Sequence, residues 1–423
     1  MIAVRALDLL SSMDLLSLIS LFWYACFFEL PRYTIGALVV GGAACFVPER
    51  PGECDDLSFT VLLVGHNEAT TLRKAVEGLA EQTIAKKRGR FHIIVVDDGS
   101  TDRMSEIAFE LQREGKVAQV LRSHQRGGKS ASINLGVSAC TSDIVFIIDV
   151  DTTFDRDAFE IALSYFADPR VGAVSGNLGV RNPFASLITH HQAIEYAIGL
   201  TLGRRIADAL GILSIVSGAF GGYRRAAIEG VGGHDVEVGE DADLTLKLRR
   251  AGWRIRFAPG ARGLTDVPET VAALIAQRLR WDRGIITIWT RKFRSVFNPR
   301  SSTFRILEVC AVLDVILYQA LLALVFPFYL VWLFYYFSDF AWTVIAATLV
   351  AYFAANFLAF AVAAATGLNH PLRLLPYVPL YTVVQMTLLR VIRLIAIVQE
   401  LVLRSSYRDP FVPARVMSQV ERL

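Results

Sequence analysis

Charged residues are scarce in this chain of 423 residues. Asp, Glu, Lys and Arg make up 20% of it, hydrophobic residues make up 53%, and the mean hydropathy is +0.43. An ordinary soluble domain is less apolar. The apolar excess lies mainly in residues 1–48 and 306–403, whereas residues 51–300 have the charge content of a soluble α/β domain. The composition predicts a soluble unit between two membrane parts. The net charge of +3 is too small to suggest a nucleic-acid partner.

Several sequence signatures are also absent. Neither GxxxxGK[ST] nor GxGxxG occurs, so a P-loop or dinucleotide-binding domain has no support. No cysteines form a CxxC or another metal-ligand spacing, and we interpret them as small hydrophobes rather than a disulfide framework or zinc site. The cysteines are Cys26, Cys45, Cys54, Cys140 and Cys310. No clear small-residue cleavage site follows the first apolar region, which argues against a cleaved signal peptide.

Apolar segments flank the soluble unit on both sides. A membrane span needs about 20 apolar residues. Leu15–Leu30 is therefore expected to be able to span a bilayer, while Thr34–Val47 is short and either marginal or interfacial. The C-terminal candidates are about Leu307–Phe337, Ala341–Ala365 and Tyr377–Leu403. The first of these is long enough to be a tilted span, or a short interfacial helix that continues into a span.

Basic residues indicate an orientation for the chain. The cluster Arg291-Lys292-Phe293-Arg294, with Arg300 and Arg305, precedes the C-terminal apolar part. By the positive-inside rule, this cluster places residues 51–300 in the cytoplasm. Three C-terminal spans would then put the basic tail on the other side, so the number of crossings stays open. The basic tail residues are Arg404, Arg408 and Arg415.

The last apolar segment contains polar side chains. They are Arg390, Arg393, Gln399 and Glu400. A charge inside a span costs about 2.5–3.5 kcal/mol on insertion scales, so such residues usually face a cavity. Two interpretations stay open: these residues line a polar channel, or they belong to an interfacial helix whose charged ends reach the headgroups.

The soluble middle alternates apolar runs with helical stretches. The expected strands are Phe59–Gly65, His92–Asp97, Val117–Leu121, Ile144–Asp149 and Val171–Gly176. The expected helices are Glu68–Glu81, Asp102–Glu114, Lys129–Ala139 and Asp155–Phe166. Nearly continuous apolar runs are typical of parallel strands covered on both faces. The pattern predicts a doubly wound α/β (Rossmann-like) sheet, with ligands at the carboxyl ends of its strands.

Polar residues follow the expected strands at these carboxyl ends. His66-Asn67-Glu68, Asp97-Asp98-Gly99-Ser100 and the pair Asp149 and Asp151 each come directly after or at the end of a strand. The loop Gln125–Ser130 leads into a helix, where backbone N–H groups and Lys129 favour an anion. Each motif alone is more often a plain turn. Their joint placement is what predicts a site.

Asp149 and Asp151 suit a hard divalent cation that also holds donor phosphates. Such a metal would neutralise the charge that grows on a departing diphosphate. Carboxylate pairs at strand ends are often structural, so the prediction depends on the surrounding motifs.

Gly239-Glu240-Asp241-Ala242-Asp243 begins a further helix. Asp241 is either an ordinary N-cap or first-turn acid, or a general base that accepts the proton of an attacking sugar hydroxyl. Glu240 and Asp243 are rival candidates for that role.

The motif Gln277-Arg278-Leu279-Arg280-Trp281 lies in the amphipathic stretch Val271–Phe293. Trp281 either anchors this helix at the membrane interface or stacks on a sugar ring as a flat apolar platform. Arg280 is able to pair with diphosphate oxygens.

Taken together and in order, these motifs resemble those of membrane-integrated family 2 glycosyltransferases, which include cellulose, chitin, hyaluronan and poly-N-acetylglucosamine synthases. The likeness covers about residues 58–285. The motifs are Asn67-Glu68, Asp97–Ser100, Gly128-Lys129, Asp149-Val150-Asp151, Ser217-Gly218, Gly239-Glu240-Asp241 and Gln277–Trp281. One departure is Gly239, because cellulose synthases usually carry Thr-Glu-Asp at this motif.

The resemblance implies a GT-A fold, a UDP-sugar donor, Mg²⁺ or Mn²⁺, and inversion at the anomeric carbon. It implies that Asp149 and Asp151 bind the metal, that Asp241 is the base, and that Asp98, or its neighbour Asp97, holds uracil. The other implied donor-binding residues are His66, Asn67, Glu68, Lys129, Asp149, Gln277 and Arg280. The implied acceptor-binding residues are Trp281, Glu240, Ser217 and Gly218.

The expected organisation has five parts. They are an N-terminal membrane part (1–50), the catalytic domain (51–265), amphipathic interface helices (266–305), about three transmembrane helices (306–403) and a tail (404–423). The expected function is a processive β-glycosyltransferase of the bacterial inner membrane that uses UDP-GlcNAc or UDP-glucose, extends a polysaccharide and exports it, alone or with envelope partners or as an oligomer. The alternatives are a non-processive transferase that makes a glycolipid and, with less support because no inverted repeats are evident, a transporter.

Overall fold

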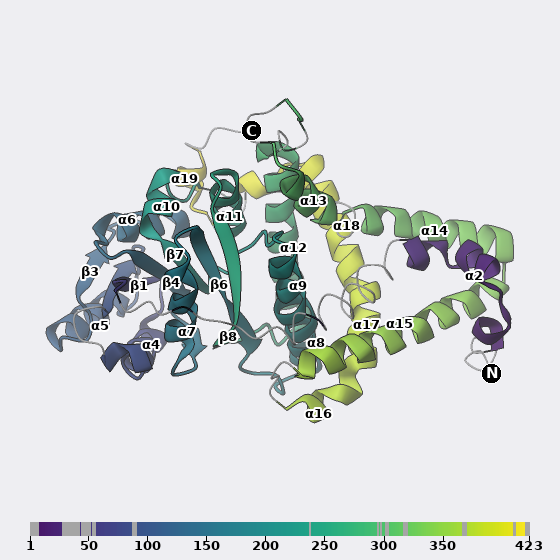
Figure 1. Ribbon diagram of the computed structural model, residues 1–423, viewed down its shortest axis with the longest axis horizontal. Helices are drawn as coiled ribbons and strands as arrows, with labels where there is room; N and C mark the ends of the chain where they lie inside the picture. The colour runs from purple at the N-terminus through teal and green to yellow at the C-terminus, as the bar shows by residue number, and fades with distance from the viewer. Residues whose placement is uncertain are drawn as a thin grey trace.

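The chain forms an elongated molecule with an α/β domain at one end and apolar helices at the other (Figure 1). The computed structural model describes residues 8–27, 56–86, 91–236, 238–293, 298–300, 304–315, 320–365, 370–408 and 412–418, and the single residues 43, 52 and 296. The expected segment Thr34–Val47 lies, apart from residue 43, outside the described residues.

The α/β domain is built on an eight-stranded sheet with the order β3-β2-β1-β4-β7-β6-β8-β5. The strands are β1 (Phe59–Gly65), β2 (Phe91–Asp97), β3 (Gln119–Arg122), β4 (Ile144–Asp149), β5 (Thr153–Phe154), β6 (Val171–Val180), β7 (Phe220–Arg224) and β8 (Arg254–Thr265). Strands β1 to β4 are parallel, and β1 is buried along its whole length. The carboxyl ends of β1, β2 and β4 therefore meet at one edge of the sheet, as the apolar runs predicted.

The sequence analysis did not predict β7 or the antiparallel pairing that this strand introduces. Strand β7 runs antiparallel to both β4 and β6, so the sheet is mixed. This strand reads Phe-Gly-Gly-Tyr-Arg, and adjacent glycines lower the strand propensity of a sequence. A Cβ on Gly222 would lie 2.6 Å from Cε1 of Phe146, so close packing requires glycine there. Gly222 thus allows β7 to pack against β4 and also lowers the strand propensity of this segment, so the sequence did not predict the strand.

Helices cover both faces of the sheet. α4 (Ala69–Ala80), α5 (Met104–Arg113) and α7 (Ala158–Ser164) pack on one face, and α6 (Lys129–Ala139), α10 (Arg225–Gly230) and α11 (Glu240–Arg250) pack on the other. The first four of these in chain order match expected helices, with ends that differ by up to three residues. The two hydrophobic cores, one on each face, hold the strand ends in place.

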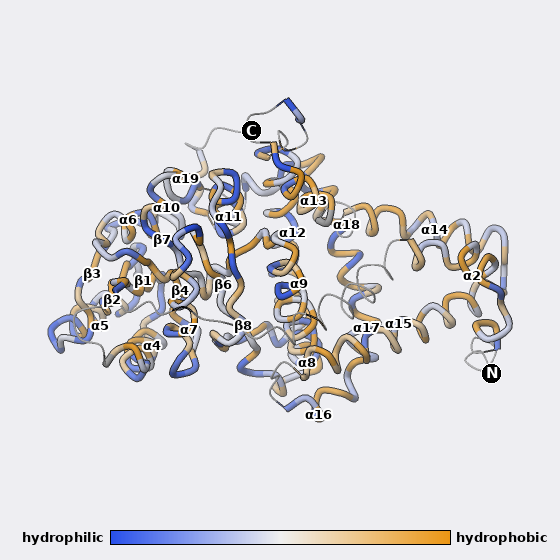
Figure 2. Tube along the Cα trace, in the orientation of Figure 1, coloured by the Kyte–Doolittle hydropathy of each residue, from blue (hydrophilic) through white to orange (hydrophobic). Residues whose placement is uncertain are grey.

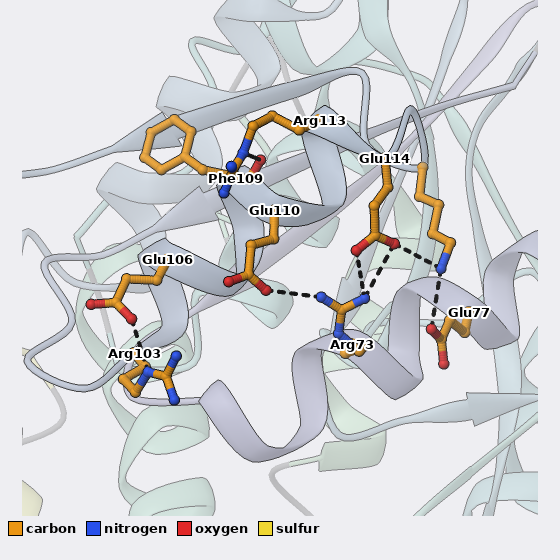
Figure 3. A network of polar contacts seen from close by, with 9 residues as sticks. Arg73, Glu77, Arg103, Glu106, Phe109, Glu110, Arg113 and Glu114 are labelled. Atoms are coloured by element: carbon orange, nitrogen blue, oxygen red, sulfur yellow. Dashed lines mark hydrogen bonds and ion pairs between the residues drawn. The ribbon is translucent and has the colours of Figure 1, made fainter.

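Ion pairs join α4 to α5 on the outer surface of the domain (Figure 3). Arg73 lies 2.9 Å from Glu114 and 3.0 Å from Glu110, and Lys116 lies 3.2 Å from Glu77. These side chains are substantially exposed, so water and salt weaken their attraction. We therefore assign the stability of this layer to its buried apolar contacts.

A group of helices lies between the sheet and the apolar helices (Figure 1). The group consists of α8 (Leu187–Glu195), the π-helix η4 (Tyr196–Leu202), α9 (Gly203–Ala209), α12 (Val271–Thr287), the π-helix η5 (Ile288–Lys292) and α13 (Ile306–Val315). The amphipathic stretch expected at Val271–Phe293 is thus helical from α12 through η5. A would-be Cβ on Gly284 of α12 meets the backbone oxygen of Val238 at 2.5 Å, so α12 packs directly on the segment that precedes α11.

The apolar helices extend from α8 and α12 to the far end of the molecule, and Figure 2 shows long hydrophobic stretches along them. They are α2 (Leu15–Leu21), α14 (Leu322–Phe337), α15 (Phe340–Ala365), α16 (Pro371–Leu374), η8 (Leu375–Tyr377), α17 (Val378–Met386) and α18 (Leu388–Leu401). Among the described residues, Phe340–Ala365 and Pro371–Leu401 are long and apolar enough to cross a bilayer. The stretch expected at Leu307–Phe337 is divided between α13 and α14.

A buried ion pair attaches α11 to α13. Arg249 donates to both carboxylate oxygens of Glu308, at 3.0 and 2.7 Å, and to the backbone oxygens of Gly211 and Leu213. Both charged side chains are almost completely buried. The pair therefore joins the catalytic-side helix α11 to the first helix of the C-terminal part.

We predict that Glu308→Gln lowers the free energy of unfolding by about 3 kcal/mol, because it leaves the buried charge of Arg249 without its counter-ion. Thermal unfolding in detergent measures the effect. Glu110→Gln breaks an exposed pair between α4 and α5 and serves as the matched control, with no change in Tm expected. Equal Tm shifts in the two variants would contradict the assignment.

Candidate active site

An ion pair stands at the carboxyl edge of the sheet. Lys129 begins α6, and its Nζ donates to Oδ1 of Asp149, the last residue of β4, at 2.6 Å. The same Nζ lies 3.7 Å from a carboxylate oxygen of Glu240, the first residue of α11. One cation thus joins two acids that are 91 residues apart in the chain. Burial opposes the charge of Lys129, but Asp149 and Glu240 outweigh it and raise its pKa above the ordinary value.

Three further carboxyl groups lie at the site, and each has a raised pKa. Burial raises the pKa of Glu240, and the charge of Lys129 opposes that rise. Burial and the neighbouring Asp149 raise the pKa of Asp151. Burial also raises the pKa of Glu68, against a hydrogen bond from Thr71, and Asp151 and Asp149 add to the rise. These carboxylates would attract a cation, because its positive charge would offset the repulsion among them.

The pair Asp149 and Asp151 fits a divalent metal that is held partly by substrate. Within the described residues, no group of three or more His, Cys, Asp and Glu side chains forms a metal site. Mg²⁺ and similar ions are commonly bound through one or two carboxylates, with phosphates and water completing the shell. Asp149 and Asp151, whose charges repel each other, satisfy that requirement, whereas a resident structural metal would need more ligands.

The loop before α6 is fixed by Asp98. Its carboxylate accepts hydrogen bonds from the N–H of Gly127 at 2.7 Å, the N–H of Gly128 at 2.9 Å and the hydroxyl of Ser132 at 2.8 Å. Asp98 therefore positions Lys129. The implied contact of Asp98 with uracil stays a prediction, and the carboxylate would have to share oxygens that already accept these bonds.

His66, Asn67 and Glu68 follow β1 and lie against the end of β2. Nδ1 of His66 is 3.0 Å from the backbone oxygen of Asp98, and the amide oxygen of Asn67 accepts from the N–H of Thr101 at 2.8 Å. Asn67 has a φ of 63°, which asparagine tolerates better than most residues. These bonds join the ends of two strands, as their positions in the sequence predicted.

The three acids at the start of α11 have different surroundings. Glu240 faces Lys129, and Asp243 lies 2.7 Å from Nζ of Lys292, in a separate ion pair. A Cβ on Gly218 would lie 3.7 Å from Oδ2 of Asp241 and 3.3 Å from Nζ of Lys129. Gly218 thus gives Asp241 and Lys129 access to a common space. Its neighbour Ser217 is buried, and its backbone N–H donates to Ser175 at 3.3 Å.

Gly239 sets the entry to α11. It has a φ of 94°, a left-handed conformation that an L side chain rarely adopts, and a Cβ there would lie 3.4 Å from Ile288. The sequence marked Gly239 only as a departure from the Thr-Glu-Asp form. In the fold this glycine lets α12 and η5 approach the acidic motif closely.

Two residues near Asp241 escaped the sequence analysis. Arg204 of α9 is partly buried and donates to the hydroxyl of Ser175 at 3.2 Å. Desolvation lowers the pKa of Arg204, and the charge of Asp241 opposes this. Burial raises the pKa of Tyr223, with further contributions from Asp241 and Glu240. No local motif surrounds either residue, so only the folded arrangement reveals that they lie near the site.

The Gln277–Trp281 motif lies on α12. Trp281 is 36% exposed, and the guanidinium carbon of Arg278 lies 4.3 Å from the centre of its indole ring. The side-chain oxygen of Gln277 is buried, with no hydrogen-bond partner among the described residues. The implied contacts of Gln277 and Arg280 with a diphosphate stay predictions.

The arginines of α18 have specific neighbours. Arg390 lies over the rings of Phe326 at 4.4 Å and Tyr24 at 5.4 Å, in the apolar end of the molecule. Arg393 lies 3.5 Å from Asp282, the residue after Trp281. Arg393 thus connects α18 to the residue after the Gln277–Trp281 motif, whereas Arg390 packs among aromatic rings. A polar channel along α18 stays a prediction.

The chain has a GT-A-like Rossmann α/β fold. The solved mannosyltransferase PcManGT from Pyrobaculum calidifontis, in complex with GDP-Man and Mn²⁺, has a TM-score of 0.61 and covers 95% of this chain and 99% of its own. Its sequence identity is 21%, so this likeness concerns the fold alone.

The sequence comparisons are narrower. Residues 60–232 match the model of glycosyl transferase family 2. The poly-β-1,6-N-acetyl-D-glucosamine synthase of Staphylococcus aureus (strain COL) is 32% identical over 243 residues, which are 57% of this chain and 58% of the relative. The synthase of Staphylococcus epidermidis is 30% identical over 257 residues, 60% of each chain. Residues 60–232 are therefore similar to a glycosyltransferase family 2 domain, and the alignments span less than two thirds of these relatives.

We predict that Gly218→Ala lowers kcat/KM about tenfold or more while Tm changes little. The added methyl group would enter the space shared by Lys129 and Asp241 and displace the reacting groups. Gly78→Ala is the matched control, since nothing lies within 4 Å of a Cβ at Gly78 of α4. Steady-state kinetics with thermal unfolding separates the two effects. Full activity of Gly218→Ala would show that this space is not used.

His234 gives the protein a defined acid sensitivity. Burial, with the charges of Lys129 and Lys247, lowers the pKa of His234 from 6.5 to about 4. The folded state then binds a proton less readily than the unfolded chain. This contribution to stability is present above pH 6.5 and is lost as pH falls toward 4.

We predict that His234→Leu reduces the loss of stability between pH 6.5 and 4 by up to about 3 kcal/mol. Urea unfolding at a series of pH values measures the slope. An unchanged slope in the variant would mean that His234 is not held neutral in the folded state.

Proposed function

We propose that the chain is a processive, inverting β-glycosyltransferase that transfers a sugar from a UDP-sugar to a growing polysaccharide. The observation that carries this proposal is the cluster of Lys129, Asp149 and Glu240, which shares a space with Gly218 and Asp241 beside α12. The names of the similar synthases favour UDP-GlcNAc over UDP-glucose as the donor.

The donor diphosphate would lie against Lys129. Its ammonium group already neutralises Asp149 and is close enough to the same edge to compensate phosphate charge. Asp149 and Asp151 would hold Mg²⁺ or Mn²⁺, and when bound this ion supplies electrostatic stabilisation of the leaving diphosphate. His66, Asn67 and Glu68, at the ends of β1 and β2, lie on the side where the nucleoside would extend.

The proton of the attacking hydroxyl would pass to Asp241. Its Oδ2 faces the space beside Gly218, while Oδ1 accepts the N–H of Ala242 at 2.8 Å and is thereby oriented. A hydroxyl deprotonated there would attack the anomeric carbon from the side opposite the diphosphate, which inverts the configuration. Glu240 is occupied by Lys129 and Asp243 by Lys292, which favours Asp241 among the three acids.

The acceptor would stack on Trp281. This ring is partly exposed on α12, the helix that packs on the segment preceding α11. We place residues 51–265 in the cytoplasm as the catalytic domain, residues 266–305 at the interface, and the helices of 1–50 and 306–403 in the bacterial inner membrane. In this arrangement the polymer would leave through the membrane part, with or without envelope partners.

A donor screen tests this function. Purified protein with Mg²⁺ or Mn²⁺ would be incubated with UDP-GlcNAc, UDP-glucose, UDP-GlcA, UDP-Gal and GDP-mannose, and nucleotide release and product linkage would be measured. We expect release from UDP-GlcNAc and a long β-linked polymer. A single-sugar lipid product would contradict the proposal.

A non-processive transferase is the second candidate function. The fold does not distinguish it from the processive enzyme, because the likeness to the mannosyltransferase, at 21% identity, concerns the fold alone. Product length separates the two candidates: a processive enzyme makes long chains while most primers are unextended, and a non-processive one adds a single sugar to each acceptor.

We predict that Asp241→Asn lowers elongation at least about a hundredfold, since general-base catalysis contributes this much, with UDP binding retained. Glu240→Gln is the matched comparison at the adjacent acid. If Asp241→Asn retained turnover and Glu240→Gln abolished it, the base would be Glu240.

A further inference from the structure

Arg278, in the Gln277–Trp281 motif, has no role in the proposed function. It is 8% exposed, whereas Trp281, one turn further along α12, is 36% exposed. Its guanidinium carbon lies 4.3 Å from the centre of the Trp281 ring, within the range of a cation–π contact. Arg278 therefore covers part of the indole that the acceptor would use.

The guanidinium of Arg278 is itself held by a second helix. Its Nη2 donates to Oε2 of Glu195, the last residue of α8, at 2.7 Å. The exposed fractions of the two side chains are 10% and 17%, so solvent screens this pair less than a surface pair. The orientation of Arg278 over Trp281 thus depends on a residue 83 positions away in the chain.

The position of Glu195 is fixed in turn. Nε2 of His191, one turn earlier on α8, lies 3.7 Å from the same carboxylate oxygen. The ring of His191 is completely buried and stacks on Tyr381 of α17 with the centroids 5.4 Å apart. A continuous series of contacts thus runs from Trp281 through α12 and α8 to α17.

The opposite side of the motif is also anchored. Asp282 follows Trp281 and lies 3.5 Å from Arg393 of α18. The backbone of α12 is therefore held by α18, while Arg278 and Glu195 act on the side chain of Trp281. A planar guanidinium on the ring restricts the indole more than a flexible ammonium group would.

We propose that Arg278 and Glu195 are positioning residues that hold the indole of Trp281 in its acceptor-binding orientation. The inference rests on the proposed function, because it requires that Trp281 contacts the acceptor. Neither residue takes part in the chemical step. Loss of the pair weakens acceptor binding through Trp281 and leaves the groups around Lys129 and Asp241 in place.

Primer-dependent elongation tests the pair. Initial rates would be measured with UDP-GlcNAc and a series of concentrations of a β-linked GlcNAc oligosaccharide. For Glu195→Gln we expect the KM for the primer to rise about tenfold, with a much smaller change in kcat. Arg278→Lys retains a cation near Glu195 but loses the planar guanidinium. We expect a similar rise in the KM for the primer, with a smaller change in Tm than in Glu195→Gln. Glu110→Gln, in the exposed α4–α5 network, should leave both constants unchanged.

A double-mutant cycle distinguishes positioning from a general structural role. In a Trp281→Phe background, Glu195→Gln should raise the primer KM by less than about twofold, because the contact it supports is already altered. A rise by the same factor in both backgrounds would overturn the proposal, as would an unchanged KM in both Glu195→Gln and Arg278→Lys.

Primer extension by the wild-type protein shows whether a negative result concerns this inference or the proposed function. If the wild type extends the primer and the variants behave like it, the positioning role is wrong while the function stands. If the wild type extends no primer from any donor, the proposed function is wrong and the positioning role falls with it.

Discussion

The ion pair between Lys129 and Asp149 is the interaction on which the site depends. Asp149, Asp151, Glu240 and Glu68 lie at one edge of the sheet, and burial raises the pKa of the last three. So many acids so close together would destabilise the fold without a cation among them. Lys129 provides one positive charge. It pairs with Asp149 and Glu240 but does not neutralise all four carboxylates. The remaining demand for positive charge is the property that suits a metal–nucleotide complex.

This constraint explains why the loop before α6 is so firmly bound. Asp98 accepts three hydrogen bonds from residues of this loop and of the first turn of α6, so Lys129 begins its helix at a fixed point. The antiparallel strand β7 and the glycines that allow it bring Gly218 and α11 to the same edge. The mixed sheet is therefore a requirement of the site, because a wholly parallel continuation would carry α11 elsewhere.

Helix α12 connects the two ends of the molecule. It packs on the residues before α11, carries Trp281, and is joined to α18 through Asp282. The π-helix η5, which continues α12, is joined to α18 through Arg291. The pair of Arg291 with Glu400 is buried, and Glu400 also accepts from Ser406 at 2.7 Å. Trp281 is thus fixed with respect to both the carboxyl edge of the sheet and the apolar helices, as the proposed acceptor role would require.

The sequence predicted the parts of this arrangement that are local in the chain. The apolar runs of β1, β2 and β4 and the polar residues after them were enough to locate the edge and to propose Asp149, Asp151 and Lys129. The sequence did not reveal β7, whose glycines contradict strand propensity, nor Arg204 and Glu195. These two act through contacts with residues 37 and 83 positions away, and no periodicity or motif records such contacts. The residues alone also left Glu240 and Asp243 as rivals of Asp241, whereas the fold pairs Glu240 with Lys129 and Asp243 with Lys292.

Calorimetric titration of UDP into the purified protein, with and without Mn²⁺, tests the central claim most directly. If the carboxylate edge is completed by a metal–nucleotide complex, Mn²⁺ should tighten UDP binding at least about tenfold. This coupling should disappear in Asp149→Asn, because that variant removes both the ion pair and a metal ligand. UDP binding that is equally tight with and without Mn²⁺, or coupling that survives in Asp149→Asn, would contradict the account.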